Sequence, residues 1–421
     1  ILEGSFRFPR RKSDMTWRDL TFSTSLLSVR SLLRSLFCGL CLCAVSSAGP
    51  VSAQGSAKPE KIAPPLFEFT FTDDQKQEQI IEAAQILQAQ DGGVVMLTRD
   101  GRLLTATPEQ LKSKRLLNRE FTPLDAGELE KQLKAEFGED FTVTQTKHFT
   151  ICSQAGNRYS QWCSYLFERL YMVLHNYWDD KASPLHDPEV PLIAVIFKDR
   201  ANFEQYASQL LGEGAAATHG FYSIQSNRMV LYDLTAGPNE RPAYTDADIL
   251  FKLRKSPFNV ATIIHECTHQ IAFNVGLHTR FADNPLWLTE GMATYFETPD
   301  LKSKTGWRTV GKPNPWRLRQ FQDYARSRRP ADSLQTLISS DQRFQEAEAV
   351  LDTYAEAWAF SYFLIKTKRR QYEEYVHLIA ARKPLIWSTP EERLKDFQSV
   401  FGADLAQLDQ QFLRYMRQIS R

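Results

Sequence analysis

The sequence predicts an α+β protein with a modest sheet in its central part and a helical region at its C-terminal end. Two observations predict this class. Strand-like and helix-like patterns alternate between residues 141 and 232, and a nearly continuous helical pattern runs from about 313 to 417. Segregation of helices from a small sheet is typical of α+β proteins. An Asp-Gly turn between two apolar runs adds a hairpin nearer the N-terminus.

The composition is that of an ordinary globular protein. The chain has 421 residues, of which 43% are hydrophobic, 24% charged and 12% aromatic. These values exclude a disordered tail, a collagen-like repeat and a small disulfide scaffold, and the length suits two or three domains. The 51 basic and 50 acidic residues leave a net charge of +1. Without a basic stripe, nucleic acid is not an expected partner, because phosphate binding needs clustered Lys and Arg.

The first 53 residues have the pattern of an export signal with an upstream extension. Arginines precede an apolar run from Leu36 to Val45, and small residues ending at Ala53 suit a signal-peptidase cut. The run is shorter than the roughly 20 residues that a membrane span needs. We therefore expect an exported protein, periplasmic or extracellular, without stable membrane insertion after cleavage. An uncleaved membrane anchor is the alternative.

Three cysteines follow the signal. Export permits a disulfide between Cys152 and Cys163. The sequence favours equally the alternative of two separate buried thiols. Cys267 lies in an expected helix, where we expect it to pack as a small apolar side chain.

Residues 54–138 form an expected small α+β unit that starts with a polar linker. Helical periodicity from Glu78 to Gln90 predicts a helix, and Leu124 to Phe137 predicts a second helix that begins at Asp125. Between them, Asp100-Gly101 separates two apolar runs and predicts a β-hairpin.

Residues 139–305 form an expected central domain, and residues 306–421 an expected helical domain. The central domain should contain three strands and four helices. The strands are expected over Phe141–Cys152, Pro191–Phe197 and Arg228–Tyr232, and the helices over Tyr159–Trp178, Asn202–Leu211, Val260–Val275 and Pro285–Phe296.

The helix from Val260 to Val275 carries the sequence His-Glu-Cys-Thr-His. His265 and His269 are four residues apart, so they lie on one face of a helix, about 6 Å apart along its axis. Two imidazoles at this spacing suit one zinc ion, and Glu266 can take a proton from water beside it. The alternative is a purely structural core helix in which the two histidines are hydrogen-bonded and bind no metal.

The segment Leu-Trp-Leu-Thr-Glu-Gly-Met-Ala-Thr-Tyr-Phe-Glu follows, from Leu286 to Glu297. Together with the His-Glu-x-x-His motif it resembles the gluzincin metallopeptidases, and most of all the aminopeptidase N group. The resemblance implies a zincin-like (thermolysin-like) catalytic domain and a single Zn²⁺ with Glu290 as its third protein ligand. Thr294 and Glu297 lie on the same helix face as Glu290 and are expected to orient the ligands.

A further resemblance concerns Tyr354, which precedes an apolar helix. Gluzincin aminopeptidases have a Tyr-Glu-x-Gly segment about this far downstream, and its Tyr donates a hydrogen bond to the developing oxyanion. Ala355 and Ala357 depart from that pattern. The resemblance implies the same role for Tyr354. His219, Tyr222 and Tyr232 are rival donors, and simple core packing of Tyr354 is the alternative.

One feature of the aminopeptidases is missing. The Glu that binds the substrate's free amine has no counterpart in the segment that ends at Tyr232, which argues against an aminopeptidase. We expect this segment to form an edge strand to which an extended peptide adds through main-chain hydrogen bonds. The expected substrate strand consists of Arg228, Met229, Val230, Leu231 and Tyr232.

The whole chain resembles an exported bacterial family of unassigned function in the peptidase MA-like clan. We therefore expect a zinc-dependent hydrolase, an exported endopeptidase with Glu266 as general base and a peptide or protein as substrate. The alternatives are a catalytically silent binding protein with this fold and a zinc hydrolase that acts on a cell-wall amide. The oligomeric state is left open.

Overall fold

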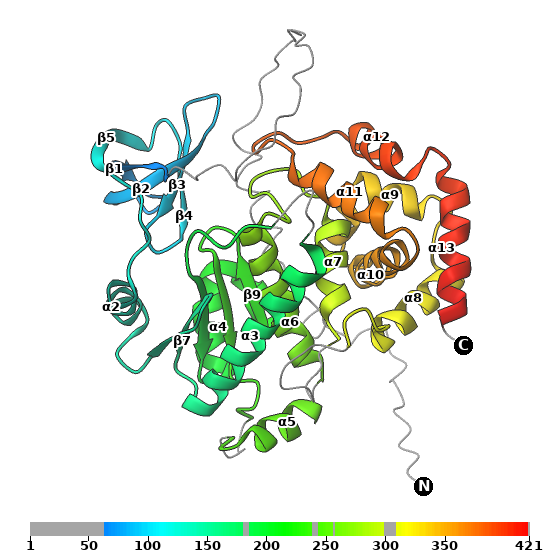
Figure 1. The fold of residues 1–421 in the computed structure, drawn as a ribbon, viewed down its shortest axis with the longest axis horizontal. Coiled ribbons are helices and arrows are strands. Elements are labelled where there is room, and N and C mark those ends of the chain that lie inside the picture. The colour runs from blue at the N-terminus through cyan, green and yellow to red at the C-terminus, as the bar shows by residue number, and fades with distance from the viewer. Residues whose placement is uncertain (1–62, 180–184, 238–242, 256, 299–308, 420–421) are drawn as a thin grey trace.

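A computed structural model describes residues 63–179, 185–237, 243–255, 257–298 and 309–419 (Figure 1). The expected signal peptide lies outside these residues. Within them, no helix combines the length and the apolar character that a membrane span requires. The chain forms two five-stranded sheets and a set of helices, which confirms the α+β class.

The first sheet is antiparallel and has the strand order β4-β3-β2-β1-β5. Its strands are β1 (Pro65–Thr72), β2 (Glu78–Gln88), β3 (Val94–Thr98), β4 (Leu103–Ala106) and β5 (Leu111–Glu120). β3 and β4 pair around the Asp100-Gly101 turn, which confirms the predicted hairpin.

The predicted helix over Glu78–Gln90 is wrong, because these residues form β2. The strand pairs with β1 on one side and with β3 on the other. Ala83 and Ala84 are both fully buried, each in the core on a different face of the sheet. The spacing of the apolar residues is compatible with a helix or a strand. Pairing with two neighbouring strands favours the strand.

The predicted second helix of this region is confirmed as α2 (Ala126–Phe137). The Asp125 side chain accepts a hydrogen bond from the Glu128 amide, and the Glu128 side chain accepts one from the Asp125 amide. Its buried Leu129 and Leu133 pack into the core of the second sheet rather than the first.

The second sheet has the order β6-β7-β8-β10-β9. Its strands are β6 (Thr142–Gln145), β7 (Phe149–Ser153), β8 (Leu192–Phe197), β9 (Gly220–Ser223) and β10 (Arg228–Tyr232). β7, β8 and β10 are parallel, and β6 and β9 are antiparallel strands at the two edges. The single strand predicted from Phe141 to Cys152 is thus a pair of strands.

The prediction of an edge strand over residues 228–232 is wrong. β10 lies between β8 and β9, so its main-chain groups pair on both sides. The five side chains from Arg228 to Tyr232 are buried. β9, which the sequence did not indicate, takes the edge position. A peptide therefore cannot add to β10 as expected.

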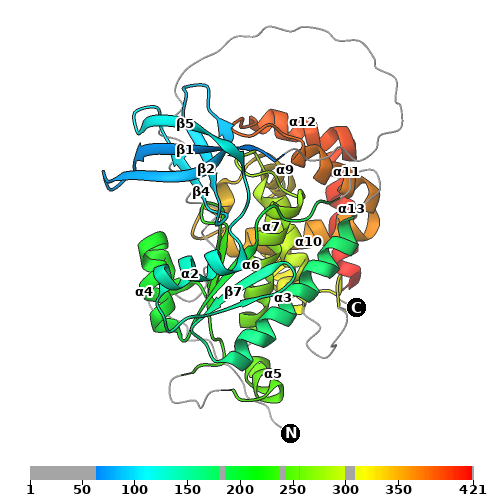
Figure 2. The ribbon, with the colours of Figure 1, turned by 60° about the vertical axis from the view of Figure 1, so that its left-hand side comes forward.

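Helices cover both faces of the second sheet (Figures 1 and 2). α3 (Asn157–Trp178) and α6 (Pro257–Val275) pack on one face, and α2 and α4 (Arg200–Leu211) pack on the other. Cys152 is in the core on one face and Cys163 in the core on the other, so both are free buried thiols and the disulfide alternative is wrong. Cys267 packs in the core as predicted.

The C-terminal part of the fold is helical, as the pattern over 313–417 predicted (Figure 1). Its α-helices are α8 (Pro315–Ser327), α9 (Ser333–Ser339), α10 (Val350–Thr367), α11 (Arg369–Ala380), α12 (Pro390–Phe401) and α13 (Leu405–Ile419). Before them, α7 (Leu286–Phe296) matches the helix predicted over Pro285–Phe296, and the short α5 (Asp246–Lys255) precedes α6. α10 is buried along most of its length and packs against α7, α8 and α13.

Gly291 allows α7 and α10 to approach closely. A Cβ at this position would lie 2.8 Å from the Ala357 carbonyl oxygen and still closer to the Ser361 hydroxyl. We expect Gly291→Ala to lower the free energy of unfolding by about 1–3 kcal/mol, because overpacking forces the helices apart. Denaturant unfolding measures the change. Gly127→Ala is the control, since its Cβ would lie 3.5 Å from the Asp125 carboxylate, an ordinary contact. Equal stability of the two variants would contradict the prediction.

Candidate metal centre

Two helices bring three candidate ligands together. α6 carries His265 and His269, whose Nε2 atoms lie 3.1 Å apart, and α7 carries Glu290. The Glu290 Oε2 lies 3.0 Å from Nε2 of His265 and 3.5 Å from Nε2 of His269. All three side chains are almost completely buried. The two helices pack against each other, and both contribute buried apolar side chains to the same core.

The donor atoms fit a single tetrahedral metal ion. Ligand bonds of about 2.0–2.1 Å in a tetrahedron place neighbouring donors roughly 3.4 Å apart, close to the observed separations. Two imidazoles and one carboxylate form a donor set that zinc takes in catalytic sites. Among the described residues, these three are the group of His, Cys, Asp and Glu side chains whose ligand atoms converge on one point.

Opposite charges stabilise the three side chains in the metal-free protein. Burial disfavours a charged imidazole, but hydrogen bonds to Glu290 and Glu297 outweigh it and raise the pKa of His265 to about 10. Burial likewise opposes ionisation of Glu290, but the charges and hydrogen bonds of the two histidines lower its pKa to about 2. Without a metal, a pKa of about 10 keeps His265 protonated at neutral pH, and its charge pairs with Glu290 and Glu297.

Glu297 holds the far side of His265. Its Oε1 lies 3.0 Å from the Nδ1 of His265 and so directs Nε2 of the same ring toward Glu290. Arg317 donates to both carboxylate oxygens of Glu297, at 3.2 and 3.0 Å, and Asn314 donates to Oε2 at 3.2 Å. The contact predicted between Glu297 and a ligand is present.

Thr294 does not make the predicted contact with a ligand side chain. Its hydroxyl donates to the main-chain carbonyl of Glu290 at 2.7 Å and lies 3.1 Å from that of Gly291. A threonine hydroxyl in a helix commonly donates to the main-chain carbonyl one turn back. This hydrogen bond competes with a contact to a ligand side chain, and the prediction from the helix face did not consider it.

Glu266 lies on α6 between the two histidines. Its Oε2 accepts a hydrogen bond of 2.8 Å from the main-chain amide of Tyr222, which belongs to the edge strand β9. Burial raises the pKa of Glu266, and the charges of the nearby histidines oppose this effect. The candidate general base is thus anchored at one oxygen by the strand that borders the site.

Tyr354 lies on α10, where it is 5% exposed. Burial raises its pKa well above the usual range, and the charges of Glu290 and Glu266 act in the same direction. The rival donors are engaged elsewhere. Tyr222 donates its hydroxyl to Asn227 at 2.9 Å, and His219 Nδ1 lies 2.8 Å from the Tyr232 hydroxyl.

Several residues at the centre were not predicted from the sequence. Arg317 and Asn314 hold Glu297, and the Tyr222 amide holds Glu266. His278 is buried close enough to His269 that burial and the charge of that ring lower its pKa to about 3. Asn314 followed by Pro315 is typical of a helix start and could have identified Asn314 as the cap of α8. The sequence around Arg317 contains no pattern that indicates its contact with Glu297.

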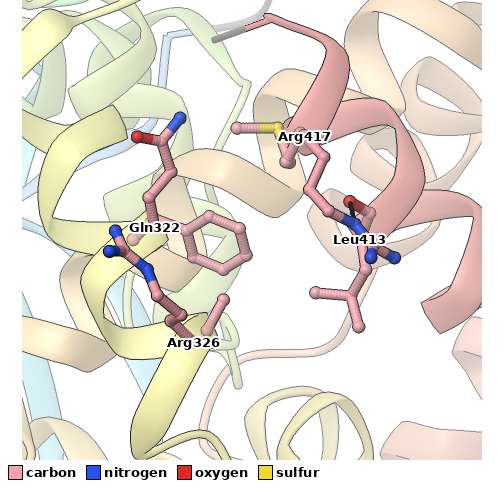
Figure 3. A pocket seen from close by; sticks show the side chains of 7 residues that line it. Gln322, Arg326, Leu413 and Arg417 are labelled. Carbon is pink, nitrogen blue, oxygen red and sulfur yellow. Dashed lines mark hydrogen bonds between the residues drawn. The ribbon is translucent and has the colours of Figure 1, made fainter.

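A surface cavity of about 430 Å³ lies between α8 and α13, and its wall contains none of the candidate metal ligands. Gln322 and Arg326 of α8 face Leu413 and Arg417 of α13 across this cavity (Figure 3). The cavity is therefore separate from the metal centre.

Residues 259–386 match a family described as a protein of unknown function (DUF1570). The matched stretch contains the three candidate ligands, Glu266, Glu297, Arg317 and Tyr354. The chain is similar to that family over this stretch, and the description assigns no activity. No curated protein matches the chain.

Proposed function

We propose that the protein is a zinc-dependent hydrolase, an exported endopeptidase of the gluzincin type whose central domain has a zincin-like fold. One observation carries this proposal. His265 and His269 from α6 and Glu290 from α7 present their donor atoms to one point, and Glu266 lies beside them on the same helix. A structural metal site would not need this additional carboxylate. The missing amine-binding Glu favours an endopeptidase over an aminopeptidase.

The chain's own residues have distinct roles in the proposed reaction. Zinc, when held by His265, His269 and Glu290, supplies Lewis acidity toward a carbonyl and toward water. Glu266 takes a proton from the attacking water and passes it to the leaving amine nitrogen. Tyr354 donates a hydrogen bond to the oxygen on which negative charge develops.

We expect Tyr354→Phe to lower kcat by about 10²–10³-fold, because loss of one oxyanion donor has an effect of this size. Zinc content should not change, since His265, His269 and Glu290 supply the converging donors and the variant leaves all three in place. Steady-state kinetics on a peptide substrate and metal analysis check both parts. Tyr222→Phe is the matched control, because the Tyr222 hydroxyl bonds to Asn227 and the variant keeps the main-chain amide that binds Glu266. If both variants retain wild-type kcat, Tyr354 has no role in the reaction.

Zinc affinity should increase with pH. In the folded protein the pKa of His265 is about 10, above its ordinary value of 6.5. Protonation of His265 therefore stabilises the metal-free protein fully below about pH 6.5, and this contribution is lost as pH rises through 10. Zinc must displace that proton, so its apparent affinity should rise up to about tenfold per pH unit between about pH 6 and pH 8. Competition with a chromophoric chelator measures this slope, and a flat profile would contradict the assignment.

The function is tested by hydrolysis of casein and of a mixed peptide library by the purified full chain. We expect cleavage at internal bonds that zinc supports and a chelator abolishes. Release of single N-terminal residues would contradict the endopeptidase proposal. Cleavage of peptidoglycan amides instead of peptides would favour the cell-wall alternative. If the chain binds zinc stoichiometrically but hydrolyses none of these substrates, the result would favour the alternative of a catalytically silent binding protein.

A further inference from the structure

Arg317 is a buried arginine to which the proposed reaction assigns no role. It belongs to α8, within the C-terminal part of the fold, and it has no exposed surface. Its guanidinium donates to both oxygens of Glu297, and its main-chain amide donates to the Asn314 side chain that also binds Glu297. Glu297 in turn contacts His265. A continuous chain of hydrogen bonds therefore leads from α8 to a candidate metal ligand.

The same guanidinium also lies beside the candidate oxyanion donor. Its central carbon is 5.7 Å from the centroid of the Tyr354 ring and 4.9 Å from that of Trp316. Arg317 thus joins Glu297, at the end of α7, to Tyr354, which lies on α10. The planar guanidinium fixes the carboxylate in two places, which a single lysine nitrogen cannot do.

Stability alone is a weak explanation for this arrangement. Burying an arginine and a glutamate removes both from water, and apolar replacement of such pairs is often neutral or stabilising. Orientation is a better explanation, because a histidine ligand needs a fixed partner on its other nitrogen to direct it at a metal. The partner can do so only if its own carboxylate is held in place.

We propose that Arg317 is a positioning residue that fixes the orientation of Glu297 and, through Glu297, that of His265. The C-terminal helical part of the chain, to which α8 belongs, would thereby set the affinity of the centre for its metal. This inference rests on the proposed function, because it requires that the three converging ligands bind a metal ion.

The experiment measures zinc affinity of the full chain by competition with a chromophoric chelator, and the absorption spectrum of the Co²⁺-substituted protein. We expect Arg317→Met to weaken zinc binding about 10–100-fold, as loss of residues that orient metal ligands does. The Co²⁺ spectrum should shift because His265 is no longer held. Arg317→Lys should recover part of the loss.

Two further variants separate positioning from general destabilisation. Arg382→Met removes another arginine of the helical part, which binds Asp283 and Asp396, and it should keep wild-type zinc affinity. In a Glu297→Gln background, Arg317→Met should add no further loss, because Arg317 acts through that carboxylate. Additive losses would overturn the proposal.

The outcomes distinguish this inference from the proposed function. If the wild-type chain binds neither zinc nor Co²⁺, the proposed function fails and the inference fails with it. If the wild type binds both and Arg317→Met has the same affinity and spectrum, the inference alone is overturned. Should Arg317→Met not fold, Arg317→Lys and Asn314→Ala replace it. Unchanged affinity and spectrum in both would equally overturn the proposal.

Discussion

We expect Glu266→Gln to lower kcat for peptide hydrolysis by about 10²–10⁴-fold, the usual contribution of a general base. The amide cannot accept a proton from water at neutral pH. It can still accept the hydrogen bond from the Tyr222 amide, so the local structure should persist. Zinc content should stay at one ion per chain, because Glu266 is not among the converging ligands. Steady-state kinetics and metal analysis of the same preparation measure both quantities.

Glu168→Gln provides the matched control for this variant. Glu168 also accepts a hydrogen bond from a main-chain amide, that of His148, but it lies on α3 and outside the metal centre. We expect it to retain wild-type kcat and zinc content. Full hydrolysis by Glu266→Gln would refute the proposed mechanism, whereas equal losses in both variants would point to a general effect on the fold.

The second large effect is expected for Glu290→Ala, which should abolish stoichiometric zinc binding. The variant leaves His265 and His269 as the only protein ligands at the point where three donors converge. The loss of affinity should exceed the roughly 10–100-fold that loss of an orienting residue produces. Metal analysis after dialysis against a weak chelator measures the loss, and hydrolysis should disappear with the metal.

The contrast with Glu297→Gln makes this prediction specific. Glu297 touches His265 but does not converge with the donor atoms, so its amide variant should keep a weakened zinc site. Glu168→Ala should keep full zinc content, since its carboxylate serves Thr146 and His148. If Glu290→Ala retains one tightly bound zinc per chain, Glu290 is not a ligand, and the proposed centre is wrong.

The local parts of the candidate centre were predictable because they depend on short-range geometry. Two histidines four residues apart share a helix face whatever surrounds the helix, and Glu297 lies on the same face as Glu290. The confirmed helices α2, α3 and α6 likewise follow from apolar periodicity within each segment, and α2 follows also from its capping residue Asp125. Thr294 shows the limit of this reasoning, because a helix-face argument does not tell whether a hydroxyl bonds outward or to its own backbone.

Pairing between distant segments was not predictable in the same way. The residues of β2 have apolar spacing that suits a helix or a strand, and hydrogen bonds to β1 and β3 decide between them. β10 was identified as a strand, yet only its position between β8 and β9 excludes it from the edge. Cys152 and Cys163 lie close in sequence but on opposite faces of the sheet.

The sequence by itself therefore determined the α+β class, the helices that carry the candidate ligands, and the spacing of His265, Glu266 and His269. Apart from Glu297, the residues that hold those ligands in place were decided by the tertiary structure alone. Arg317 lies 20 residues beyond Glu297 and more than 50 beyond His265. Such contacts form only when α8 packs against α10 and meets the end of α7. A buried charged group has lost its contact with water, so it depends on the partners that other segments bring to it.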